Sequence, residues 1–281
     1  MTRQRLFVIT LLALMAFAGN SLLCRAAFHA TKIDAASFTT VRIAAGALML
    51  GLIARLRRPG RDVAGSWASA LALFAYAAAF SFAYVSLTAA TGALLLFGAV
   101  QATMIGFGLA KGERLRSWQL TGLFAALAGL FGLLLPGLSA PPLRGSVLML
   151  VAGVAWGVYS LHGKGGGDPL RVTAGNFLRA LPFAAVLSAA TLRWASLDLA
   201  GIAMAVASGA VTSGIGYAIW YTALPWLKTT TAATVQLSVP VIAALGGVAL
   251  LGETPTPRLL LAAIAILGGI ALVIGGRRRL A

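Results

Sequence analysis

The sequence predicts an all-α membrane protein with ten transmembrane helices in two inverted five-helix repeats. Three observations support this: an apolar composition, a regular series of apolar runs, and a similarity between the two halves at a shift of about 140 residues. Of the 281 residues, 60% are hydrophobic and only 10% are charged, and the mean hydropathy is +0.93. A soluble domain carries about 25% charged residues, so this chain cannot cover a globule of its size with polar surface.

Each apolar run is close to the roughly 20 residues that a helix needs to cross a bilayer. Charged residues, glycine or proline bound the runs, and the remaining residues suffice only for tails and loops. We therefore expect no separate soluble domain. In chain order the predicted spans are 6–27, 35–54, 65–86, 88–110, 117–137, 144–163, 171–192, 199–221, 229–251 and 258–276.

The first run could be read as a secretory signal, because Arg3 and Arg5 precede it. Its apolar stretch, however, extends beyond the length of a signal. It also carries Asn20 and Arg25 where a cleavage site would be expected. We therefore interpret it as a retained first span.

No charged residue separates the third and fourth runs, which meet between Tyr84 and Thr91. The distribution of basic residues nevertheless favours ten spans over nine. With the N-terminus inside, 15 of the 22 lysines and arginines lie on the inner side and five on the outer, while Arg42 and Arg179 lie within spans. Cytoplasmic loops carry the excess of Lys and Arg, so both termini are expected in the cytoplasm. Nine spans would place Arg277–Arg279 outside.

Residues 1–140 and 141–281 are predicted to be equivalent units of five spans each. Gly-Glu follows both the fourth and the ninth span, at 112–113 and 252–253. An odd number of spans inverts the second unit, and inverted repeats are typical of transporters with a site near the midplane between the units. Other landmarks match in the same order: Phe17–Ser21 with Trp156–Ser160, Arg25 with Lys164, Arg42 with Arg179, and Tyr84–Leu87 with Tyr221–Leu224.

The stretch from Ala232 to Ala244, continuing into Leu251-Gly252-Glu253, resembles the drug/metabolite transporter superfamily, specifically its ten-span EamA-domain exporters. A weaker copy ends at Gly112-Glu113, and the resemblance covers nearly the whole chain. It implies a multi-pass exporter of small metabolites in the bacterial inner membrane that works by alternating access. Val100 stands where the second half has Pro240, so the resemblance does not imply a symmetric kink in the fourth span.

Aromatic residues on several spans are candidates for a substrate cavity, and such a cavity would be similar to that of the YddG-type amino-acid exporters. Tyr76 and Phe80 lie four residues apart and share one helix face. The alternative for these rings is ordinary helix packing. Gln236 joins them because an amide in hydrocarbon needs a polar partner. The expected substrate-binding residues are Phe17, Tyr76, Phe80, Trp156, Tyr159, Tyr217, Trp220 and Gln236.

Three further residues are candidates for steering the substrate or gating its path. Arg42 and Arg179 could attract a substrate carboxylate or pin a gate; otherwise they reach toward headgroups or bind backbone carbonyls. Pro240 removes a backbone donor, which is tolerated where a span lines a cavity. Arg25, near the end of its span, is expected to reach toward the headgroups.

All six carboxylates are predicted at span ends or in loops. The lack of an intramembrane acid argues against a proton-coupled exporter of lipophilic cations and favours neutral or zwitterionic substrates. Together with the resemblance to amino-acid exporters, this leads us to expect export of amino acids, including aromatic ones. Drug export by the same fold stays open, and a membrane enzyme or lipid scramblase is less favoured.

No enzymatic or cofactor-binding motif is apparent. Gly163–Gly167 lacks the Ser or Thr that follows the lysine of a phosphate-binding loop, and Cys24 alone can form neither an intrachain disulfide nor a cysteine-built zinc site. We expect no catalytic residue, metal, cofactor or nucleic-acid partner. The expected partners are a small-molecule substrate and the lipid bilayer, and a monomer would suffice because both repeats lie in one chain.

Overall fold

The computed structural model describes residues 1–57, 64–112, 114–137, 140–162, 167–227 and 229–275. Within these residues the protein is all-helical, and ten helical segments are long and apolar enough to cross a membrane. This confirms the predicted class and number of spans. Eight spans are single helices: α1 Arg3–Ala30, α2 Ala35–Arg57, α3 Trp67–Tyr84, α4 Ala89–Ala110, α5 Ser117–Leu134, α6 Leu143–His162, α7 Pro169–Ala190 and α12 Pro257–Gly275.

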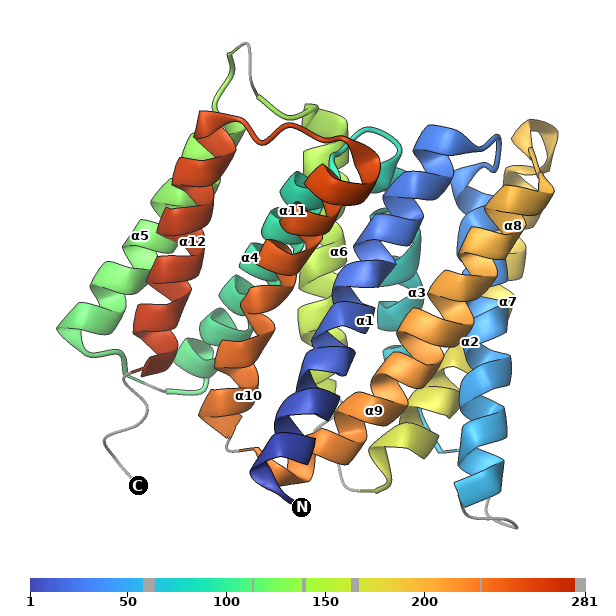
Figure 1. The fold of residues 1–281 in the computed structure, drawn as a ribbon, viewed down its shortest axis with the longest axis horizontal. Coiled ribbons are helices and arrows are strands. Elements are labelled where there is room, and N and C mark those ends of the chain that lie inside the picture. The colour runs from blue at the N-terminus through green and yellow to red at the C-terminus, as the bar shows by residue number, and fades with distance from the viewer. Residues whose placement is uncertain (58–63, 113, 138–139, 163–166, 228, 276–281) are drawn as a thin grey trace.

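The helices lie side by side in one bundle (Figure 1). We call the end that holds Arg3 the Arg3 end and the opposite one the Ala30 end; α12 finishes at the Arg3 end, as an even number of spans requires. The α5–α12 pair forms one side of the bundle and the α2–α7 pair the other. Between them α3 packs on α6, and α1 packs on the eighth span. The first of these contacts joins the third and sixth spans, and the second joins the eighth and first spans. If each span is replaced by the one five places away along the chain, each contact becomes the other.

Two glycines allow α5 and α12 to approach each other closely. A Cβ at Gly122 would lie 2.6 Å from the carbonyl oxygen of Gly269, and one at Gly269 would collide with the carbonyl oxygen of Gly122. Gly153 and Gly157 of α6 contact α4 in a similar way, at Ala99 and Thr103. Small residues at helix contacts let backbones approach where no hydrophobic force drives helices together in lipid.

Alanine at Gly122 is expected to lower the free energy of unfolding by about 1–3 kcal/mol, because its methyl group forces the two backbones apart. Gly132 on the same helix is the matched control, since a Cβ there has no neighbour within 4 Å. Gly132→Ala should leave stability unchanged or raise it by up to about 1 kcal/mol through helix propensity. Thermal unfolding in detergent measures both variants, and equal midpoints would contradict this account of the α5–α12 contact.

The eighth span contains a π-helical segment that the sequence analysis did not predict. The α8 helix, Leu199–Val206, continues through the π-helical Ala207–Ile215 into α9, Gly216–Ala223. Here Gly209 rests directly on the carbonyl group of Arg42 in α2, where no Cβ could fit. Such segments are rare and frequently occur at functional sites. Short 3₁₀ turns flank this span at Leu192–Trp194 and Leu224–Trp226.

The ninth span, predicted as one run over 229–251, is interrupted close to Pro240. It consists of α10, Thr229–Gln236, and α11, Ser238–Leu251, separated by Leu237. Pro240 is buried in the first turn of α11, where its ring nitrogen cannot donate to the carbonyl group of Gln236. The hydroxyl group of Ser238 instead donates to the carbonyl oxygen of Val235 at 2.6 Å. The interruption is therefore partly compensated by side-chain bonding.

Two carboxylates tie together loops at the Ala30 end. Asp34 accepts the backbone N–H groups of Ser37 at 3.0 Å and Ser196 at 2.9 Å, and Asp198 accepts that of Lys32. Partial burial raises the pKa of Asp34, but the hydrogen bonds outweigh it, and the net pKa is lowered. These bonds hold the start of α2, and with it Arg42, against the start of the eighth span.

Several residues of the sequence analysis lie outside the described residues. They include Glu113 and Lys164 of the repeat match, the larger part of the Gly163–Gly167 loop, and the basic residues Arg277–Arg279. The repeat match at these positions stays a prediction.

Candidate functional site

The centre of the bundle holds a connected cluster of aromatic rings. Trp156 lies in its middle: its ring centroid is 4.7 Å from that of Tyr76, 5.1 Å from that of Tyr159 and 5.8 Å from that of Tyr217, on which it stacks. All seven aromatic residues expected to bind substrate belong to this cluster. Its members, from α1, α3, α6, α7 and α9, are Phe17, Tyr76, Phe80, Tyr84, Trp156, Tyr159, Phe177, Tyr217, Trp220 and Tyr221.

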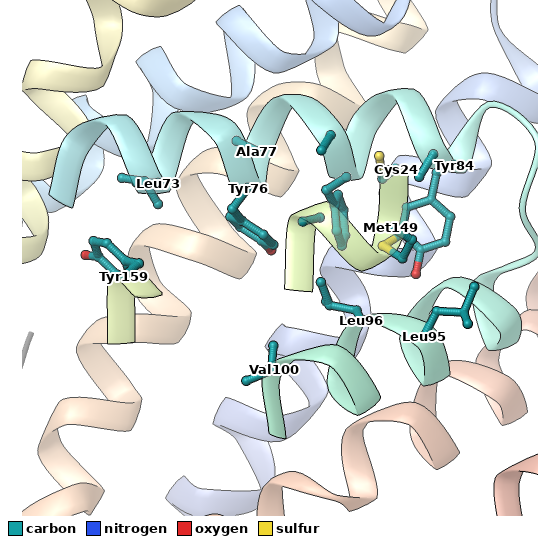
Figure 2. Close-up of a cluster of buried hydrophobic side chains, with 14 of the residues drawn as sticks. Cys24, Leu73, Tyr76, Ala77, Tyr84, Leu95, Leu96, Val100, Met149 and Tyr159 are labelled. Carbon is teal, nitrogen blue, oxygen red and sulfur yellow. The ribbon is translucent and has the colours of Figure 1, made fainter. Parts of the chain in front are cut away.

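The helix spacing explains why these rings meet. Tyr76, Phe80 and Tyr84 recur every fourth residue, so they share one face of α3. Figure 2 shows Tyr76 and Tyr84 projecting from α3 toward the side of the bundle that carries Met149 of α6 and Leu95 of α4. The rings of Phe80 and Tyr84 meet edge to face at 4.7 Å, a geometry that aromatic pairs favour.

The cluster is closely packed. Phe80 is 1% exposed and Tyr76, Tyr159, Tyr217 and Trp220 are each 6% exposed, while Phe17 and Trp156 are half-buried. In the described conformation the rings therefore contact one another directly.

A group of polar side chains adjoins the rings. The hydroxyl oxygen of Tyr76 accepts hydrogen bonds from Arg42 Nη2 at 3.1 Å and from Asn20 Nδ2 at 3.4 Å. Asn20 Oδ1 in turn accepts from the hydroxyl groups of Ser208 at 2.5 Å and Thr212 at 3.4 Å, both on the π-helical segment. Hydrogen bonds of this kind between helices constrain the relative positions of the helices that carry them. Here they join α1, α2, α3 and the eighth span.

Arg42 itself is only 2% exposed. Its guanidinium carbon lies 4.7 Å from the ring centroid of Phe80 and 5.4 Å from that of Tyr76. The structure thus places Arg42 beside the predicted substrate-binding residues rather than at the headgroups.

Arg179 has a different environment from Arg42, although the repeat pairs them. Its Nη1 donates to the backbone carbonyl groups of Ala64 at 3.0 Å and Gly175 at 3.3 Å. Neighbouring Asn176 binds the backbone N–H of Ser66 at 2.9 Å through Oδ1. Both side chains tie α7 to the residues that lead into α3.

Gln236 is half-buried at the end of α10. Its side chain has no hydrogen-bond partner among the described residues and makes none of the contacts of the aromatic cluster. The structure therefore brings together the seven predicted rings and Arg42, but leaves Arg179 and Gln236 outside that group.

The Ala30 end of the bundle is joined by an ion pair. Arg25 Nε lies 3.2 Å from Glu253 Oε1, and Arg25 also donates to the carbonyl oxygen of Tyr84 at 3.4 Å. Both carboxylate oxygens of Glu253 accept the backbone N–H of Ala89, at 3.1 and 2.9 Å. Arg25 thus connects α1, α3, α4 and the end of α11. The expectation that it reaches toward the headgroups is wrong, because a carboxylate is within bonding distance.

A separate groove of about 280 Å³ lies near the Arg3 end between α1, α2 and α9. It shares no lining residue with the aromatic cluster. Most of its lining is aliphatic, with Arg57 and Thr222 as the polar members, and these two are hydrogen-bonded at 3.3 Å.

Comparison with known proteins places this architecture in a family. The model of the EamA-like transporter family matches residues 143–275. An uncharacterized protein of Pseudomonas aeruginosa, PA1977, is 59% identical over 278 residues, which are 99% of this chain and 97% of that protein. The chain belongs to the EamA-like transporter family. It is therefore an EamA-type, multi-pass membrane transporter of the drug/metabolite transporter superfamily.

Two further similarities concern about half of the chain and the overall fold. The threonine/homoserine exporter RhtA of Escherichia coli K12 is 36% identical over 150 residues, and that of Salmonella typhimurium LT2 is 37% identical. The match spans about half the length of each exporter, 49%. A crystal structure with 21% identity covers 97% of this chain and 99% of its own, with a TM-score of 0.64, and it supports the fold.

Proposed function

We propose that this EamA-type transporter exports small metabolites, amino acids including aromatic ones, across the bacterial inner membrane by alternating access. It is not an enzyme, and drug export by the same fold is the second candidate. The observation that carries the proposal is the aromatic cluster, because Trp156 joins rings from residues 1–140 to rings from residues 141–281.

A cluster shared between two inverted units suits alternating access. Rocking one unit against the other separates contacts such as Tyr76–Trp156 and Phe17–Tyr217, which join the two halves. Aromatic faces bind apolar and aromatic side chains through area burial and ring–ring contacts worth about 0.5–1.5 kcal/mol each. In this scheme the rings contact the substrate and Gln236 offers a polar group. Arg42, Arg179 and Pro240 steer or gate.

Uptake into proteoliposomes tests the proposal directly. Labelled L-phenylalanine, L-threonine and a lipophilic cation would be offered separately, with and without an imposed pH gradient. We expect saturable uptake of L-phenylalanine without a gradient and little uptake of the cation, because no intramembrane acid is expected. Uptake of the cation alone would favour the drug-exporter alternative, and uptake of none of the three ligands, by folded protein, would refute amino-acid export.

Both termini are expected to lie in the cytoplasm, since the predicted inner loops carry most of the basic residues. Green fluorescent protein fused after residue 281 should therefore fluoresce, and alkaline phosphatase at that position should be inactive. Alkaline phosphatase fused after Lys32 or Arg193, both in predicted outer loops, should be active. The reverse pattern would show the opposite orientation.

A further inference from the structure

Arg42 lies about two helical turns inside the membrane, and its bonding is incomplete. It is the eighth residue of α2, about 10 Å from the start of the helix at a rise of about 1.5 Å per residue. Nη2 donates to the hydroxyl group of Tyr76, but Nη1 is buried and has no hydrogen-bond partner among the described residues. A buried donor without a partner on a charged group costs free energy. Binding of an acceptor to this nitrogen would remove that cost.

The charge of Arg42 also has no counter-ion among the residues that the structure describes. In the described part of the chain one ion pair is present, and it joins Arg25 to Glu253. Asp34, Asp168 and Asp198 accept backbone N–H groups at helix starts. The two carboxylates outside the described residues, Asp62 and Glu113, are predicted in loops.

The ring faces of Phe80 and Tyr76 offset part of this cost through cation–π contacts. A charge inside the membrane that has no protein counter-charge is a mark of function. The missing partner is therefore an anion that arrives from outside the protein.

Tyr76 supplies a second donor at the same place. Its oxygen already accepts from Arg42 and Asn20, and no described residue accepts its proton. Arg42 Nη1 and the Tyr76 hydroxyl proton therefore form a pair of donors beside one another. Two adjacent donors, one of them a guanidinium, match the two oxygens of a carboxylate.

We propose that Arg42 Nη1 and the Tyr76 hydroxyl group bind the carboxylate of the transported substrate. The substrate's side chain then lies against Trp156, whose ring centroid is 4.7 Å from that of Tyr76. The inference rests on the proposed export of amino acids, and it narrows the substrates to molecules with a free carboxylate. Amides, esters and amines of the same shape are rejected, because they leave Arg42 buried without its counter-ion.

Pairs of ligands that differ only in the carboxylate test this without any substitution. Phenylacetate and isovalerate would be compared with phenylacetamide and isovaleramide for thermal stabilisation of the purified protein in detergent. We expect at least one carboxylate to bind about 10- to 100-fold more tightly than its amide, the range of a charge-assisted hydrogen bond. Equal binding within both pairs, or no binding of either carboxylate, would overturn the proposal.

Variants at Arg42 locate the effect. Arg42→Gln should remove the preference for carboxylates, and Arg42→Lys should keep part of it. Arg55→Gln is the matched control, because it makes the same change on the exposed end of the same helix. If Arg42 has only a structural role, the folded Arg42→Gln variant will still prefer carboxylates. That result would contradict the assignment of Arg42 to the carboxylate site. If that variant does not fold, the ligand pairs on the unaltered protein decide.

These ligands lack an α-amino group, so the test is independent of amino-acid transport. A preference for carboxylates with no amino-acid uptake would refute the proposed function and leave the anion site standing. Amino-acid uptake that is blocked equally well by L-phenylalaninamide and by L-phenylalanine would support the proposed function and refute the carboxylate site.

Discussion

Replacement of Trp156 by alanine is expected to reduce uptake of aromatic amino acids at least about tenfold. Its ring contacts Tyr76 of the first half and both Tyr159 and Tyr217 of the second. Truncation removes several ring–ring contacts of about 0.5–1.5 kcal/mol each. It also removes the apolar surface against which a substrate side chain would lie, and about 1.4 kcal/mol corresponds to a tenfold change in binding.

Kinetics of uptake separate this role from a general loss of folding. We expect KM for L-phenylalanine to rise in Trp156→Ala and to recover in part in Trp156→Phe, which keeps a ring. Trp118→Ala is the control, since Trp118 is 38% exposed at the start of α5. Unchanged KM in folded Trp156→Ala would remove Trp156 from the substrate site while leaving the fold as described.

The fold was predictable because each bilayer crossing requires about 20 apolar residues, and the chain marks most boundaries with charge, glycine or proline. The predicted span 35–54 became Ala35–Arg57, and 117–137 became Ser117–Leu134. The residues between the predicted and observed ends of these two spans suit either a helix end or a loop. The turn between Tyr84 and Thr91, without any charge, is capped instead by Thr88, whose hydroxyl oxygen accepts the backbone N–H of Thr91.

The aromatic part of the candidate site was predictable from helix spacing, and Arg42 was a candidate too, but the hydrogen bonds of Asn20 were not predictable. Rings three or four residues apart share a face, and such faces can be read from one helix at a time. The bonds from Asn20 to Tyr76 and Ser208 join three helices, so no single helix reveals them. One signal was present: Asn20 lies three residues after Phe17 and therefore on the same face of α1.

The predicted repeat pairs Arg42 with Arg179, but the two side chains have different environments. Arg42 is buried among rings, whereas Arg179 binds the carbonyl group of Ala64. What a buried arginine bonds depends on the neighbouring helices, and these differ in sequence between the halves. The π-helical segment beside Arg42 was equally hidden, because it changes the hydrogen-bond register without altering the apolar pattern.

Removal of the Glu253 side chain is expected to open the Ala30 end and to expose the chain's single cysteine. Glu253 holds Arg25 of α1 and the first N–H of α4 at one point. Cys24, the residue before Arg25, is fully buried and lies close to Tyr84 in Figure 2. Its modification by N-ethylmaleimide therefore requires the helices around it to separate, and the labelling rate reports how often they do.

We expect Glu253→Ala to increase the labelling rate of Cys24 about 10- to 100-fold. Loss of one partner of a fully buried ion pair costs about 3–5 kcal/mol. Here the side chains of Arg25 and Glu253 are 18% and 11% exposed, so a smaller cost applies. Part of that cost appears as easier local opening, and each 1.4 kcal/mol raises the open population tenfold. Glu253→Gln should give a smaller increase, because its amide oxygen can still accept from Ala89.

Asp168→Ala is the matched control, since Asp168 also accepts a backbone N–H at a helix start but lies at the Arg3 end, where α7 begins. It should leave the labelling rate unchanged, and Cys24→Ser should abolish labelling. An equal increase in Asp168→Ala would indicate general loosening of the bundle. No increase in Glu253→Ala would show that other contacts close the Ala30 end. A selective increase would make the Arg25–Glu253 pair a gate, whose opening lets the rings around Trp156 separate toward that side of the membrane.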